Sequence, residues 1–277
     1  MYEQMIIGGL MNMKVFISAD IEGTAFTTYW DETERDKSYY AAAQLEMTRE
    51  VRAAIDGAMA AGATEILVND AHDYATNLDP NEMPACVELI RGWSGSPMGM
   101  VEGIDESFDA AMFVGWHSPA GTCFNPLSHT MSTKSARVTL NGIPCSEFLL
   151  YSSACAMRGV PSVLLTGDRH LIEISRSLHP GLHTVAVKDG FGGMTRCKAP
   201  VLVHQEIRAA AEASLRQDLK KACIELPKRF TFEITYRQPK DAVRYSYYPG
   251  FKLIDDLTIR MVTSDYMNVL RAAWFCL

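Results

Sequence analysis

Acidic and imidazole side chains follow several apolar runs of this chain, each at the point where the run ends. Asp20 and Glu22 follow the apolar run Met13–Ala19, and two later apolar runs end at His72 and at His117. Side chains alternate along an extended strand, so Asp20 and Glu22 point to the same side. Two neighbouring carboxylates repel each other unless a positive charge lies between them. A divalent metal ion is therefore the expected partner.

Two more acidic residues extend this pattern. The apolar run Val163–Gly167 ends at Asp168, and Glu147 stands near the start of a predicted helix. Ligands bind at the carboxyl ends of the strands of an open α/β sheet, so we expect these polar residues to share one edge. The predicted metal ligands are Asp20, Glu22, His72, His117 and Glu147.

This mixture of carboxylates and imidazoles favours zinc, with manganese or cobalt as alternatives. Five ligands exceed what one tetrahedral site needs, and they suit two divalent metal ions per subunit that share one bridging carboxylate. Asp20 is the best candidate for the bridge, because it ends its strand and offers both carboxylate oxygens.

Three other polar residues have predicted roles near this edge. His129 lies in the polar loop Pro126–Met131, and we predict that it acts in the chemical step, by moving a proton or by attacking carbon. Asp70 lies beside His72 but on the opposite strand face, so we expect it to cap a loop or support a ligand, and Asp168 to act similarly. Each residue alone is a weak signal, so the metal-site hypothesis depends on their shared sheet edge.

The order of apolar and amphipathic segments predicts an α/β fold. In residues 13–190 strands alternate with helices, which predicts a three-layer, mostly parallel sheet with helices on both faces. Asn141-Gly142 predicts the turn of a hairpin over 137–145. Amphipathic periodicity predicts helices at 41–61, 146–158, 170–178, 200–222 and 265–275.

The sequence predicts three segments along the chain. Residues 1–12 form an N-terminal extension, 13–190 an α/β metal-binding catalytic domain, and 191–277 a smaller α+β domain. Phe191–Met194 is expected to be a flexible joint between the two domains. Residues 230–237 alternate between apolar and polar side chains, which predicts a strand, with 257–262 as its partner.

Composition excludes several classes of protein. A net charge of −7, with no cluster of Lys and Arg, argues against nucleic acid as a partner. The sequence contains no apolar run of the ~18 residues that a membrane helix needs, so we expect no membrane association. The seven cysteines form no C-x-x-C pair, which favours free thiols in a reducing cytoplasm.

The same polar residues lie in a series of short motifs whose order resembles the D-aminopeptidase family of zinc metallopeptidases, of the dipeptide-transport-operon type. The resemblance covers residues 13–198 well and the remainder loosely. The motifs are Ser18–Gly23, Val68–His72, Met100–Gly103, Gly115–His117, Ser128–Met131 and Gly142–Glu147.

The resemblance implies a two-zinc aminopeptidase that removes the N-terminal residue of short peptides, with a preference for D-amino acids. It also implies a homo-oligomer, a ring-stacked decamer whose sites face an inner channel. By motif position, the metal ligands are again the five residues named above, and the catalytic nucleophile is His129. The loop 118–127 departs from the family pattern, so glycyl, β-amino acid and L-peptides stay open as substrates.

Two alternatives compete with the peptidase. The sequence Asp20–Thr24 also resembles the signature of haloacid-dehalogenase-like, magnesium-dependent phosphatases, in which Asp20 would be the nucleophile. That reading puts Glu22 where an Asp is expected and gives the histidines no role. The second alternative is a non-catalytic, ligand-binding α/β domain that contains a structural metal.

Overall fold

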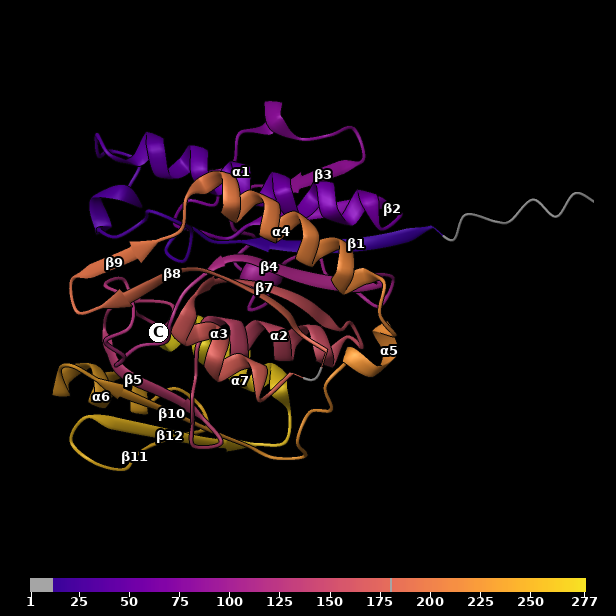
Figure 1. The fold of residues 1–277 in the computed structure, drawn as a ribbon. Helices are drawn as coiled ribbons and strands as arrows, with labels where there is room; N and C mark the ends of the chain where they lie inside the picture. Colours follow the sequence, from indigo (N-terminus) through magenta and orange to yellow (C-terminus); the bar gives the residue numbers. More distant parts are fainter. Residues whose placement is uncertain (1–11, 180) are drawn as a thin grey trace, which may run out of the picture.

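Two sheets organise the residues that the computed structural model describes, 12–179 and 181–277 (Figure 1). The larger sheet has seven strands, and all neighbours are parallel except the last pair, β8 and β9. In spatial order these are β3 (Val87–Ile90), β2 (Ala63–Asp70), β1 (Met13–Ala19), β4 (Ala110–Trp116), β7 (Ser162–Asp168), β8 (His183–Phe191) and β9 (Met194–Cys197).

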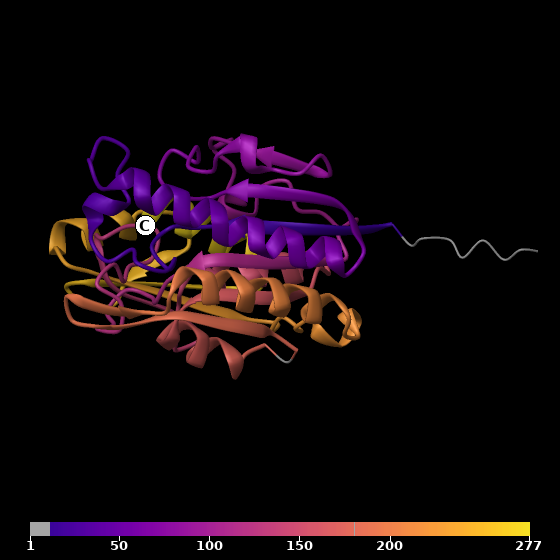
Figure 2. The ribbon, with the colours of Figure 1, turned by 45° about the horizontal axis from the view of Figure 1, so that its top comes forward.

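Helices cover both faces of this sheet, as the sequence predicts. Helices α1 (Tyr40–Ala60) and α4 (Pro200–Leu215) pack on one face, and α2 (Glu147–Met157) and α3 (Arg169–Arg176) pack on the other (Figure 2). The central strands β4 and β7 are buried along their whole length because side chains from both faces enter a core. In β1, Val15 and Ile17 join the core beneath α1 and α4, whereas Phe16 joins the core on the opposite face.

The second sheet is antiparallel and lies beyond α2 (Figure 1). The last helix, α7 (Tyr266–Cys276), packs between it and α2, and the Tyr266 hydroxyl donates a hydrogen bond of 2.7 Å to the Leu150 carbonyl. Helix α6 (Pro239–Ser246) packs against β10, β11 and β12. In spatial order the strands are β11 (Phe251–Leu253), β12 (Thr258–Thr263), β10 (Phe230–Tyr236), β5 (Ser135–Leu140) and β6 (Ile143–Pro144).

Short helices complete the secondary structure that the structure describes. Three are 3₁₀ turns in the loops after β1, β2 and β3, and a short α-helix follows α4. They are η1 (Trp30–Glu32), η2 (Pro80–Glu82), η3 (Gly99–Val101) and α5 (Leu219–Ala222).

Two local predictions are wrong. The helix expected over 200–222 is instead two helices, α4 and α5, and in the turn between them Gln217 Nε2 donates to the carbonyls of Gly181 and Ser214. The segment 191–194 is not a free joint, because it forms the turn of the antiparallel hairpin β8–β9. The predicted hairpin at 137–145 is confirmed, and both turn residues, Asn141 and Gly142, have positive φ angles.

The predicted division into domains stays a prediction, and the two sheets do not follow it. Strand β9 and helix α4, which come after residue 190, belong with the seven-stranded sheet. Strands β5 and β6, which come before it, belong to the second sheet. The predicted extension 1–12 lies outside the described residues except for Asn12. None of the helices in the described ranges combines the length and apolar character that a membrane crossing requires.

The order in which strands are added to the sheet reverses at β1. It leaves β1 for β2 on one side and later returns to β4 on the other, which opens a crevice at the carboxyl ends of these strands. Two glycines allow the strand ends to approach closely there. Gly115 has a φ of 77°, and Gly23 donates its N–H to the Gly115 carbonyl at 2.8 Å. A Cβ at Gly23 would stand 1.8 Å from the Trp116 carbonyl oxygen.

Replacing Gly23 by Ala should therefore lower the free energy of unfolding by about 2 kcal/mol or more, since backbone must move to admit the methyl group. Gly193→Ala is the matched control, because a Cβ there meets nothing within 4 Å. Its effect should stay within about 0.5 kcal/mol. Urea unfolding of both variants measures the difference, and equal stabilities would contradict the close approach.

Candidate metal centre

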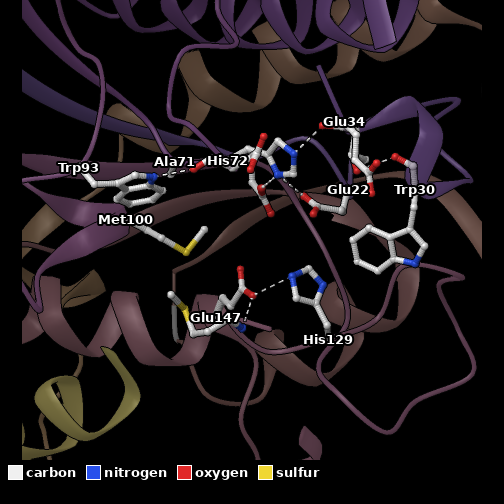
Figure 3. Close-up of a pocket in the computed structure, with 13 residues that line it drawn as sticks. Glu22, Trp30, Glu34, Ala71, His72, Trp93, Met100, His129 and Glu147 are labelled. Atoms are coloured by element: carbon white, nitrogen blue, oxygen red, sulfur yellow. Dashed lines mark hydrogen bonds and ion pairs between the residues drawn. The ribbon is translucent and has the colours of Figure 1, made fainter. Parts of the chain in front are cut away.

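The structure brings all six predicted site residues together at the carboxyl edge of the sheet. Asp20 and Glu22 follow β1, His72 follows β2, and His117 follows β4. Glu147 is the first residue of α2, and His129 comes from the loop between β4 and β5. All of them except His117 line a pocket of about 310 Å³, in which Glu22 and His72 lie across from Glu147 and His129 (Figure 3).

The candidate ligand atoms form two groups, each with histidines close to carboxylates. In the first group, His72 Nδ1 lies 3.0 Å from Glu22 Oε2 and 3.5 Å from Asp20 Oδ1. In the second, His117 Nε2 lies 3.4 Å from Glu147 Oε2, and His129 Nε2 lies 3.5 Å from Glu147 Oε1.

Asp20 connects the two groups. Its Oδ1 faces His72, while its Oδ2 lies 3.6 Å from His117 Nε2. One carboxylate thus presents a different oxygen to a histidine of each group, which is the arrangement that a bridging metal ligand needs.

Main-chain carbonyls orient all three imidazoles. His72 Nε2 lies 2.9 Å from the Thr33 carbonyl, His117 Nδ1 lies 2.9 Å from the Ser118 carbonyl, and His129 Nδ1 lies 2.8 Å from the Leu127 carbonyl. A carbonyl only accepts hydrogen bonds, so each of these nitrogens carries the proton. When an imidazole is neutral, its other ring nitrogen therefore presents a lone pair to the carboxylates, as in metal-binding histidines.

Several buried atoms of the site lack a hydrogen-bond partner among the described residues. They include Asp20 Oδ2 and His117 Nε2, which lie 3.6 Å apart. A buried polar atom without a partner is costly, and two of them that face each other suggest that a ligand completes the site. The donor set of carboxylate oxygens and imidazole nitrogens fits zinc.

In the protein without metal, the imidazoles supply the positive charge. Burial alone would lower the pKa of His117, but the carboxylates of Glu147, Asp20 and Glu22 raise it to about 10. Burial, reinforced by the charge of Glu22, raises the pKa of Asp20 well above its usual range. Burial also lowers the pKa of His129, and the neighbouring His117, whose ring stacks on it at 4.3 Å, lowers it further.

The two predicted supporting aspartates lie outside the ligand groups. Asp70 caps the loop after β2, where its Oδ2 accepts from the backbone N–H of Asn77 and of Leu78. Asp168 accepts four hydrogen bonds, from the N–H and the hydroxyl of Ser118, from Asn125 Nδ2 and from the Leu171 N–H. Asp168 therefore holds Ser118, which follows His117, and caps the start of α3.

Sequence reasoning missed the walls of the pocket. Trp30, Trp93, Met100 and Met131 line it, and Trp30 also meets the edge of the His129 ring with centroids 5.3 Å apart. These residues come from loops and 3₁₀ turns that have no periodic pattern. The only available signal was the presence of Met100 and Met131 within motifs of the resemblance.

Comparisons with known proteins agree over almost the whole chain. Residues 13–275 match a family model described as D-aminopeptidase. A D-aminopeptidase of Bacillus subtilis (strain 168) is 27% identical over 262 residues, which are 94% of this chain and 95% of the relative. The solved structure of the Zn-dependent D-aminopeptidase DppA from Bacillus subtilis, described as a self-compartmentalizing protease, has a TM-score of 0.89 at 26% identity. It covers 95% of this chain and 96% of that chain.

Metal binding should release protons at neutral pH. The pKa of His117 near 10 means that its imidazole is charged at pH 7 in the metal-free protein, yet a metal ligand must be neutral. Apparent zinc affinity should therefore rise from pH 6 to pH 8, by about tenfold per pH unit for each proton released. Calorimetric titrations in buffers of different ionisation enthalpy count the protons. A pH-independent affinity without proton release would contradict the charge balance described here.

Proposed function

Because the chain belongs to the D-aminopeptidase family, as its motifs indicated, we propose that it is a zinc-dependent aminopeptidase that hydrolyses the N-terminal residue of short peptides, with a preference for D-amino acids. The observation that carries this proposal is the arrangement around Asp20. Its two oxygens face histidines of two separate groups, and neither its buried Oδ2 nor the His117 Nε2 that this oxygen faces has a hydrogen-bond partner among the described residues.

The proposed ligands divide between two metal ions. Glu22 and His72 would hold one, His117 and Glu147 would hold the other, and Asp20 would bridge them. When bound, the zinc ions polarise a carbonyl oxygen and lower the pKa of a bound water. The pocket beside the ligands leaves room for a substrate, which favours a catalytic over a purely structural metal site.

We assign His129 to proton transfer. Its Nδ1–H is held by the Leu127 carbonyl, so Nε2 carries the lone pair. Burial and the neighbouring His117 lower the pKa of His129, which keeps the imidazole neutral at pH 7 and able to accept a proton. Hydrolysis adds water across the peptide bond, and His129 would take a proton from that water and return one to the leaving amine.

His129 also lies close enough to His117 and Glu147 to be a metal ligand. The variant His129→Ala separates the two roles. If His129 moves protons, the variant should keep two zinc ions per chain and its fold, but lose ~10² or more in kcat. His183→Ala, at the opposite edge of the sheet, is the control and should change neither. Loss of zinc would make His129 a ligand, and near-normal kcat would exclude the catalytic role.

The activity itself is tested with a panel of aminoacyl p-nitroanilides, each as the D and the L enantiomer, in the presence of zinc, manganese or cobalt. The proposal predicts hydrolysis that requires metal and is faster for D-aminoacyl substrates. Faster hydrolysis of L-, glycyl or β-aminoacyl substrates would retain the peptidase but overturn the D-preference. Absence of hydrolysis throughout the panel would overturn the proposed function.

We also propose that the chain forms a homo-oligomer, and specifically a decamer. The support is the description of DppA as a self-compartmentalizing protease, because enclosing a space requires several subunits. Light scattering at micromolar protein should give ten times the mass of one chain. A monomer mass would contradict the assembly, and another multiple would contradict the decamer alone.

A further inference from the structure

The pocket has one end lined mainly by apolar residues, called the apolar end here, and another end that contains Trp30 and Glu34. Figure 3 shows Trp93, Ala71 and Met100 on one side of Glu22 and Glu147, with Trp30 and Glu34 on the other. Met131 also lines the pocket. If the scissile bond of a peptide lies at the carboxylates, the residues before and after that bond would therefore contact different ends of the pocket.

The floor of the apolar end is tied to the strands that position the ligands. The Ser18 hydroxyl donates to the Met100 carbonyl at 2.6 Å, and Asn69 Nδ2 donates to the Gly99 carbonyl at 3.1 Å. Ser18 belongs to β1 and Asn69 to β2, the strands that precede Asp20 and His72. The Met100 side chain is 3% exposed, so it forms a fixed surface beside the site.

Met131 also lines the pocket and contacts a proposed ligand, Glu147. Its backbone has a φ of 60°, a left-handed conformation that is unfavourable for a residue with a Cβ and often marks a functional site. Its N–H donates to Glu147 Oε1 at 2.6 Å, and the Tyr151 hydroxyl donates to its sulfur at 3.6 Å. The contacts hold the Met131 side chain in one place relative to Glu147.

Trp93 also lines this pocket, and two contacts hold its ring in place. Its indole N–H donates to the Asp73 carbonyl at 2.5 Å, and its ring packs against Trp274 of α7 with centroids 5.8 Å apart. A rigid aromatic ring in a pocket that Met100 and Met131 also line makes a surface suited to an apolar side chain.

The charges at the two ends of the pocket differ as well. Glu34 lies 3.7 Å from Lys37, whereas Asp73 forms no ion pair within residues 12–179 and 181–277. Asp73 lines the pocket next to Trp93. The apolar end therefore combines an apolar surface with an unpaired carboxylate, and the N-terminal residue of a peptide carries both a side chain and an ammonium group.

We propose that Trp93, Met100 and Met131 form the subsite for the side chain of the N-terminal residue, and that this subsite selects apolar side chains larger than a methyl group. The inference rests on the proposed function. The cavity of about 310 Å³ lies at the lower end of the range of about 300–1,000 Å³ for small-ligand sites, which suits a short peptide.

Binding of amino alcohols to the zinc-loaded protein tests the subsite without hydrolysis. Leucinol and alaninol, each as the D and the L enantiomer, carry an ammonium group and differ in side-chain size. Titration calorimetry should give leucinol at least ~10-fold tighter binding than alaninol, the usual scale for added apolar contact. Trp93→Ala, or Met131→Ala if the first variant does not fold, should reduce the ratio to about threefold or less. Trp30→Ala is the matched control, because Trp30 and Trp93 are 37% and 36% exposed but lie at opposite ends.

The outcomes separate the subsite from the proposed function. The subsite would be overturned if leucinol and alaninol bound equally well, or if leucinol did not bind. It would also be overturned if Trp30→Ala lost the selectivity for leucinol while Trp93→Ala retained that selectivity. Selective binding of leucinol by a protein that hydrolyses no peptide would instead support the subsite and overturn the peptidase.

Discussion

Three carboxylates buried within reach of one another set the main physical constraint on this molecule. Asp20, Glu22 and Glu147 are 2%, 2% and 3% exposed, so water does little to screen their mutual repulsion. In the absence of metal, protonated imidazoles of His72 and His117 balance that charge. Metal ions can replace these protons, since each imidazole already donates its other N–H to a main-chain carbonyl. The burial of the carboxylates, their negative charge and the tautomers of the histidines therefore all favour the binding of metal ions.

The fold resists this repulsion by holding the loop after β1 at several points. The Glu22 carbonyl accepts from Lys188 Nζ at 2.6 Å and from Asn125 Nδ2 at 3.2 Å, and Lys188 also donates to the Thr27 carbonyl. Glu50 of α1 accepts from the Ala25 N–H, and burial raises the pKa of Glu50 to about 8. Contacts from β8, from α1 and from the loop before β5 therefore fix the segment that carries two of the proposed ligands.

The sequence predicted which residues gather at the edge of the sheet better than it predicted the loops around them, for a physical reason. Asp20, His72 and His117 end apolar strands, and parallel strands bring their carboxyl ends to one edge whatever the loops do. Trp93 and Met131 depend on loop conformations, such as the positive φ of Met131, that no periodic pattern reveals. Strands β5 and β10 pair with each other although they lie almost a hundred residues apart in the chain. The local sequence pattern does not show such a pairing, so the sequence analysis assigned the two strands to different domains. At the break after α4, Gln217 contacts Gly181, 36 positions earlier in the chain, and residue periodicity does not encode such a contact.

Anomalous diffraction at the zinc absorption edge from crystals of the zinc-loaded protein tests the central claim most directly. We expect two peaks, one beside Glu22 and His72 and one beside His117 and Glu147, with the Asp20 carboxylate between them. Asp20→Ala should lose most of both peaks, because a bridging ligand serves both ions, whereas the exposed Asp256→Ala should keep them. A single peak in the unmodified protein, or two undiminished peaks in Asp20→Ala, would contradict the bridged two-metal site.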